Sequence, residues 1–262
     1  MKRKSLGEGM LVAASLVLLA GCNGGAPAPQ GEDLAAKDAA PSTEETQMSS
    51  DASSTEGEWV DLFNGENLDG WRNYGGGVPN DAWVVEDGVL FLNVDADTEQ
   101  MTGGDLITEE QYENFELELE WKISEGGNSG VFYGVREIEG QEVAYETGIE
   151  MQILDNERHV DGKVPETSAG ACYALYPPTK QALRPVGEYN EVRLIVKDGH
   201  AEHWLNGQKI VEYEIGSEDW NRRIAESKFA DWEHFANYRM GHIGLQDHTD
   251  PVWFRNIRIR EL

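Results

Sequence analysis

The sequence from residue 58 to its end predicts an all-β domain of two packed antiparallel sheets. Apolar and polar residues alternate in most of its segments, as they do in strands that bury one face. Asn-Gly and Asp-Gly pairs separate these segments, as they do in β-hairpins. No internal repeat and no second apolar core is evident, so we expect residues 58–262 to form one β-sandwich domain.

The strand prediction rests first on Phe115–Trp121, where every odd position is apolar and every even position is glutamate. One face of this strand is expected in the core and the other in water or in a cleft. Similar apolar sets are Val131, Tyr133 and Val135; Ile149, Met151 and Ile153; Val192, Leu194 and Val196; Ile243 and Leu245; and Val252, Phe254, Ile257 and Ile259. The turn pairs are Asn64-Gly65, Asp87-Gly88, Asp198-Gly199 and Asn206-Gly207.

One segment, residues 217–238, breaks the alternation. It combines helix-forming residues with large apolar side chains, among them Trp220 and Phe229. We therefore expect a short helical insertion near 217–238, packed on an edge of the sandwich.

Residues 1–57 differ in character from the rest of the chain. The basic residues Lys2–Lys4 precede the apolar stretch Met10–Leu19, which is too short to span a bilayer. Small residues then precede Cys22, so residues 1–21 are predicted to be a lipoprotein signal peptide and Cys22 the lipidated residue. An ordinary signal peptide followed by a chance cysteine is the alternative. Residues 22–57 are small, polar and acidic, and predict a disordered tether.

This N-terminal pattern predicts a protein of the cell envelope, at the outer membrane or the periplasmic face. The lipid is expected to be its only contact with the membrane. The net charge of -28 argues against nucleic acid as a partner, because phosphates would be repelled over the whole surface. With Cys22 lipidated, Cys172 has no partner for a disulfide.

Several enzyme classes are excluded by their missing motifs. The sequence contains no Gly-rich phosphate loop, no cysteine pair with zinc spacing, no His-Glu-x-x-His and no Gly-x-Ser-x-Gly elbow.

Candidate site residues come from the strand positions that alternate with the apolar ones. These positions are rich in carboxylate, amide, imidazole and indole groups. Such groups suit carbohydrate, because hydroxyls pair with amides and carboxylates while a sugar ring stacks on tryptophan. We expect them to converge in one trough on an exposed sheet: Glu116, Glu118, Glu120, Arg136, Glu150, Gln152, Glu202, Trp204, Asn206, His242, Gln246 and His248.

Within this set Glu150 is the preferred candidate, because Gln152 shares its face and Asp155 follows at the strand end, where loops tend to hold sites. A structural carboxylate or a loop-fixing turn explains the same spacing equally well. His248 is a candidate base or metal ligand, or only a hydrogen-bonding residue near a strand end. The glutamates of Phe115–Trp121 are expected to form a solvated face rather than a catalytic array.

Motifs along the whole domain resemble the 3-keto-disaccharide hydrolase domain family. They keep their order and spacing from Glu58 to Leu262, and they are specific in combination although each is short. One departure follows His248, where the family usually has glycine and this chain has Thr249-Asp250-Pro251. The sequence therefore does not determine the conformation of this turn or the position of His248. The motifs include Val60–Gly65, Gly104–Thr108, Gly127–Phe132, Glu150–Asp155, Gly187–Asn190, His203–Gly207, Ser227–Phe229 and Gly241–His248.

The resemblance implies a concanavalin A-like jelly-roll sandwich that acts on glycosides already oxidised to a ketone at C3. Such a ketone acidifies the C2 hydrogen, so a base can remove it and the enolate can expel the C1 substituent before water adds. The resemblance implies Glu150 or His248 as base or acid, with support from Asp155. Asn128, Arg136 and Gln152 are expected to orient the sugar or to stabilise the oxyanion, Gln246 to bind the substrate, and Trp204 to stack on the sugar ring.

Two alternatives accompany this assignment. A divalent cation could hold the enolate, with Glu150, Asp155 and His248 as its first candidate ligands. The rival function is a non-catalytic, lectin-like carbohydrate-binding lipoprotein of the envelope, since this architecture hosts both enzymes and lectins.

Overall fold

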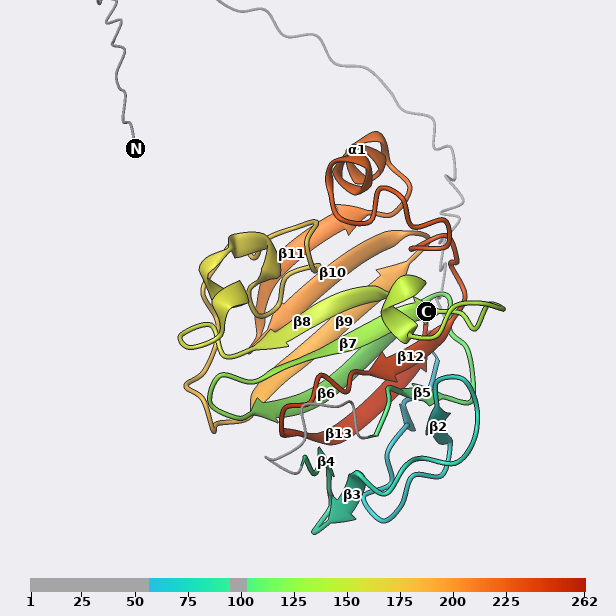
Figure 1. Ribbon diagram of the computed structural model, residues 1–262, viewed down its shortest axis with the longest axis vertical. Helices are drawn as coiled ribbons and strands as arrows, with labels where there is room; N and C mark the ends of the chain where they lie inside the picture. The colour runs from blue at the N-terminus through green and yellow to red at the C-terminus, as the bar shows by residue number, and fades with distance from the viewer. Residues whose placement is uncertain (1–56, 95–102) are drawn as a thin grey trace, which may run out of the picture. The chain divides into compact units, whose positions relative to one another are not determined.

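The computed structural model describes residues 57–94 and 103–262, which form a sandwich of two antiparallel sheets (Figure 1). The predicted signal peptide, Cys22 and almost all of the predicted tether lie outside these residues. Among the residues described, no helix has the length and hydropathy needed to cross a membrane. The predicted β-sandwich is confirmed.

The larger sheet has eight strands, and its two longest, β6 and β13, pair at its centre. Its order is β11 (Gln208–Glu214), β10 (His200–Leu205), β9 (Asn190–Lys197), β6 (Phe115–Ile123), β13 (Val252–Glu261), β4 (Val89–Leu92) and β3 (Trp83–Glu86), with β1 (Val60–Asp61) paired to β13.

The smaller sheet has five strands and lies over the larger one (Figure 1). Its order is β2 (Trp71–Asn73), β5 (Leu106–Thr108), β12 (His242–Leu245), β7 (Asn128–Val135) and β8 (Ile149–Leu154). Short 3-10 helices lie in the connections before and after β8: η1 (Ala144–Glu146), η2 (Val160–Lys163) and η3 (Pro165–Thr167).

The core lies between the sheets and is made by the alternating apolar positions that the sequence predicts. Trp121 of β6 and Met151 of β8 are both 1% exposed and belong to one cluster. Val135 is the exception. Gly134 takes a positive φ of 68° beside a break in the β7–β12 register, and Val135 packs instead with Phe132 in a separate small cluster. The prediction that Val135 continues the core face of β7 is therefore wrong, because the bulge reverses the alternation.

The predicted insertion contains one helix, α1 (Glu218–Glu226), beyond edge strand β11 (Figure 1). Ser217 caps it by accepting a hydrogen bond from the Trp220 amide at 3.1 Å. Trp220 is buried against Tyr213 of β11, with ring centroids 5.2 Å apart. Residues 227–238 continue as turns, and several of their aromatic side chains reach the outer face of the smaller sheet.

Candidate active site

A cavity of about 330 Å³ lies on the outer face of the smaller sheet. Its floor comes from β7, β8 and the chain that follows β12, and its aromatic walls come largely from the turns after α1. Its polar lining residues are Asn128, Glu150, Gln152, Lys228, Gln246 and His248, and its aromatic ones are Tyr145, Tyr173, Phe229, Trp232 and Phe235. The structure therefore brings together five of the predicted site residues.

Glu150 is the buried carboxylate of this cavity. It lies opposite Phe132 in the β7–β8 pair and is 9% exposed. Burial raises the pKa of Glu150 to about 8, and the positive charge of Lys228 opposes this rise. Among the described residues no side chain donates a hydrogen bond to this carboxylate, so it is free to take a proton from a ligand.

Three amide side chains line the same cavity and have unused hydrogen-bond acceptors. Asn128 Oδ1, Gln152 Oε1 and Gln246 Oε1 are buried and have no hydrogen-bond partner among the described residues. The nitrogen of Gln152 donates to Thr167 O at 3.3 Å, and that of Asn128 contacts His248 Nε2 at 3.3 Å. A buried polar atom without a partner costs free energy, so these oxygens favour a ligand that carries hydroxyl donors.

His248 lies at the mouth of the cavity, with its side chain 48% exposed. Its Nδ1 is 4.0 Å from Asp250 Oδ2, which also accepts from the Asn128 amide at 3.0 Å. Thr249 takes the left-handed conformation, with φ 67°, at the position where the resemblance led us to expect glycine. Its amide donates to Asp247 Oδ1 at 2.9 Å. A left-handed turn therefore forms here despite the missing glycine, and His248 reaches the cavity.

Lys228 was not among the predicted site residues. Its Nζ lies 4.2 Å from the centroid of the Tyr173 ring and 5.9 Å from that of Trp232. Ser227–Phe229 was one of the family motifs, but an irregular segment has no periodicity that tells which way a side chain points. Trp232 was not predicted for the same reason. It contacts Tyr145, with ring centroids 5.8 Å apart, and gives the cavity an apolar wall.

Trp204 does not line this cavity, and the predicted single trough is wrong. Trp204 lies on the outer face of the larger sheet, in a separate cavity of about 630 Å³, where its indole nitrogen donates to Glu202 Oε2 at 2.6 Å. Alternation tells an outward residue from an inward one, but it does not tell which sheet the residue belongs to.

The three glutamates of β6 lie on this same outer face of the larger sheet and are paired with arginines of β13. Glu120 pairs with Arg255 at 2.6 Å and Glu118 with Arg258 at 2.6 Å, while Glu116 pairs with Arg260. These pairs form a ladder between β6 and β13, and the prediction of a solvated face is wrong for Glu116, which is buried.

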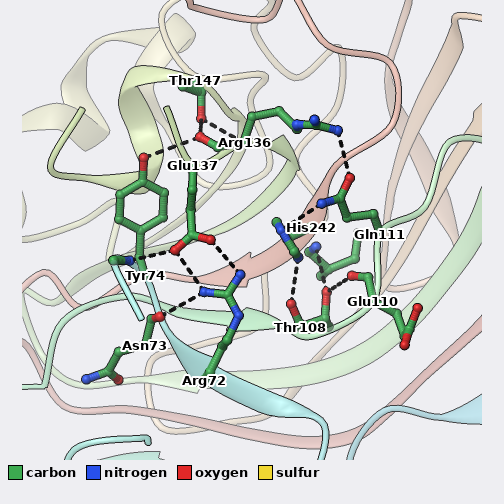
Figure 2. A network of polar contacts seen from close by, with 12 residues as sticks. Arg72, Asn73, Tyr74, Thr108, Glu110, Gln111, Arg136, Glu137, Thr147 and His242 are labelled. Carbon is green, nitrogen blue, oxygen red and sulfur yellow. Dashed lines mark hydrogen bonds and ion pairs between the residues drawn. The ribbon is translucent and has the colours of Figure 1, made fainter. Parts of the chain in front are cut away.

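Arg136 also lies outside the cavity, beyond the bulge at Gly134. Its Nη1 donates to Gln111 Oε1 at 2.8 Å, and the Gln111 amide contacts His242 at 3.0 Å (Figure 2). This network continues through Thr108, whose carbonyl lies 2.7 Å from His242 Nδ1. Arg136 and His242 thus hold loops together rather than face the candidate site.

Asp155 is engaged by the backbone of its own loop and of the turn between β6 and β7. Its Oδ2 accepts from the Gly126 amide at 2.7 Å and its Oδ1 from the Glu157 amide at 2.9 Å. Asp155 does not line the cavity, so Glu150, Asp155 and His248 do not form a common cation site.

Within the described part of the chain, another trio of possible ligands lies close together on the larger sheet. These are His200, Glu202 and Glu212. Lys209 Nζ already lies 3.0 Å from Glu202 and 2.9 Å from Glu212. The Lys209 ammonium group thus already pairs with both carboxylates of this trio.

Comparisons with known proteins agree with this geometry. Residues 58–260 match the sequence profile of the 3-keto-alpha-glucoside-1,2-lyase-like domain. A 3-keto-disaccharide hydrolase of Bacteroides thetaiotaomicron is 34% identical over 227 residues, which are 78% of this chain and 78% of the relative.

Two solved structures from Parabacteroides distasonis, both provisionally assigned as glycosyl hydrolases, share the fold. One is 36% identical, with a TM-score of 0.71 over 78% of this chain and 94% of the other. The second is 26% identical, with a TM-score of 0.60 over 78% of this chain and 100% of the other.

Proposed function

Because this chain belongs to the 3-keto-alpha-glucoside-1,2-lyase-like domain family, we propose that it cleaves the glycosidic bond of sugars that carry a ketone at C3. One observation supports this most strongly. A buried carboxylate, Glu150, shares a sugar-sized cavity with three amide oxygens that have no partner in the described residues.

The chemistry begins at C2 of the sugar. A ketone at C3 acidifies the C2 hydrogen, and the Glu150 carboxylate removes it as general base. The electron pair then expels the oxygen substituent at C1, which leaves a double bond between C1 and C2. Water adds across that bond, with oxygen going to C1 and hydrogen to C2, so that the net reaction is hydrolysis.

Other residues of the cavity bind the sugar and assist departure of the leaving group. Asn128, Gln152 and Gln246 accept hydrogen bonds from sugar hydroxyls through their unpaired oxygens. Trp232 offers a ring face for stacking. His248, at the solvent-facing mouth, donates a proton to the oxygen that leaves C1.

The rival function is a lectin that binds sugar without cleaving it. A lectin needs hydroxyl partners and a stacking ring, but it has no need for a carboxylate whose pKa is raised to about 8. The raised pKa of Glu150 therefore favours an enzyme over a lectin.

The test is release of sugar from 3-keto-disaccharides by the wild-type domain and by Glu150→Gln. We expect Glu150→Gln to lose activity by a factor of about 10³, since removal of a general base typically costs 10²–10⁴. Glu118→Gln, on the outer face of the other sheet, is the matched control and should keep full activity. Full activity of Glu150→Gln would remove this residue from the mechanism, and sugar binding without cleavage by the wild type would favour the lectin.

For the location of this activity, the N-terminal sequence supports export and lipid anchoring through Cys22. In the source bacterium or a bacterial host, the wild-type precursor should incorporate labelled palmitate and sediment with membranes. Cys22→Ser should do neither, and a soluble, unlabelled wild type would contradict the anchor.

A further inference from the structure

Lys228 is the only lysine or arginine among the described residues that line the cavity. Its amine is surrounded by rings, with Nζ 4.2 Å from the Tyr173 centroid and 5.2 Å from that of Phe229. Lys228 is exposed overall, yet among the described residues it forms no ion pair. Because it lines the cavity, its amine can reach a ligand bound there.

Partial burial lowers the pKa of Lys228, while the negative charges of Glu150 and Asp161 oppose that change. The lowered pKa increases the share of uncharged amine at a given pH, and the uncharged amine is the form that attacks carbonyl carbons, because it carries a free electron pair.

The proposed reaction also needs an electron acceptor at C3. Two of the three amide nitrogens are already engaged, because Gln152 donates to Thr167 O and Asn128 contacts His248. His248 lies at the mouth, bonded to Asn128. Lys228 is the lysine of the described lining, and a primary amine can turn the C3 carbonyl into a covalent electron acceptor.

We propose that Lys228 forms a Schiff base with the C3 ketone of the substrate; this inference rests on the proposed function and adds its covalent step. The Nζ electron pair attacks C3, and the former carbonyl oxygen leaves as water after taking protons from the amine and from solvent. The resulting iminium nitrogen accepts the electrons released when Glu150 removes the C2 proton, which gives an enamine.

The enamine returns these electrons and expels the C1 substituent, whose oxygen takes a proton from His248. Water then adds at C1, C2 regains a proton, and a second water hydrolyses the iminium to release the 3-keto sugar and Lys228. One water is formed and two are consumed, so the balance equals a single hydrolysis.

Borohydride trapping tests the covalent step directly. The wild-type protein is incubated with a 3-keto-disaccharide, sodium borohydride is added, and the protein is digested and mapped by mass spectrometry. We expect a reduced sugar adduct on the peptide that contains Lys228, and none with the corresponding unoxidised disaccharide. Lys122, whose Nζ lies 4.2 Å from the Trp253 ring centroid on the other sheet, serves as an internal control peptide and should stay unmodified.

Substitution separates a covalent role from an electrostatic one. Lys228→Arg keeps a positive charge but cannot form an iminium, so we expect its kcat to fall by a factor of about 10³ or more; Lys122→Arg should keep full activity. A wild type that cleaves the substrate but yields no adduct at Lys228, or a Lys228→Arg variant with near-normal kcat, would overturn the Schiff base and leave the proposed hydrolysis intact. Failure of the wild type to cleave any 3-keto-glycoside would instead reject the proposed function. Trapping on the wild type decides the question even where Lys228→Arg folds poorly.

Discussion

Gly130 of β7 lies directly beside the Glu150 side chain of β8. A β-carbon at residue 130 would lie 2.9 Å from Glu150 Cγ and 3.0 Å from its Cδ. The absence of a side chain at Gly130 is therefore what gives the carboxylate its place in the cavity.

Gly130→Ala should displace this carboxylate and lower kcat by a factor of about 10², the usual effect of a misplacement near 1 Å. Gly130 has no left-handed φ, so alanine adds no backbone strain there. Steady-state kinetics and thermal unfolding together check this. Gly244→Ala, which would crowd Phe132 rather than Glu150, is the control: it should lower stability without a selective loss of kcat. A Gly130→Ala variant with the kcat of the wild type would contradict the idea that Gly130 positions the Glu150 carboxylate.

The pH dependence of kcat/KM should reveal the ionisation of Glu150 in the free enzyme. Burial raises its pKa to about 8, with Lys228 opposing the rise and Asp105 and Asp161 adding to it. As a base it works only when ionised, so kcat/KM should show a rising limb with an apparent pKa of about 8, and loss of the proton that His248 donates should add a falling limb. A profile without the rising limb would contradict Glu150 as the base.

Trp204 and Glu150 show how much of the candidate site could be predicted from the sequence. Alternation placed both side chains outside the core, and both are outside it. They belong to different sheets, however, and the order of strands in a sandwich depends on long-range pairing that no local pattern contains. The family motifs predicted the fold and five residues of the cavity lining, because these lie on regular strands or next to them.

The sequence analysis missed Lys228 and wrongly assigned Arg136 to the site, in both cases because of the local backbone conformation. Lys228 lies in a turn segment without periodicity, and its direction depends on packing against Tyr173. Arg136 follows Gly134, where one residue in a left-handed conformation changes the phase of the strand. Predicting that bulge would have required knowing how β7 pairs with β12.

Thr249→Gly should stabilise the protein. Thr249 holds φ 67°, a conformation that costs a β-branched residue about 1–2 kcal/mol and glycine almost nothing. We expect a free energy of unfolding about 1 kcal/mol higher, measured by denaturant titration, with unchanged activity because His248 keeps its contact with Asn128. Thr249→Ala should gain less, since it removes the branch but keeps the β-carbon. A destabilised Thr249→Gly would show that the Thr249 side chain has a stabilising role of its own.

Trp232→Ala should weaken substrate binding, because its ring forms part of the cavity wall beside Tyr145. We expect KM to rise about tenfold with a smaller change in kcat, in line with an aromatic stacking contribution of roughly 1 kcal/mol or more. Trp204→Ala is the matched control in the other cavity and should leave KM unchanged. A raised KM in Trp204→Ala with an unchanged KM in Trp232→Ala would indicate that the sugar binds on the larger sheet.

Glu150→Gln should make the protein more stable at pH 8 while it removes activity. The folded pKa of Glu150, about 8, lies above the ordinary value of 4.5, so the folded state binds the proton more tightly than the unfolded chain does. The stability of the wild type therefore decreases as pH rises from about 4.5 to 8, over which range the unfolded chain gives up this proton first. Glutamine does not titrate, so the variant lacks this contribution. Thermal unfolding of both proteins at pH 4.5 and pH 8 should show a gap that widens in favour of Glu150→Gln at the higher pH; a gap that stays constant would mean that the carboxylate is not desolvated in the folded protein.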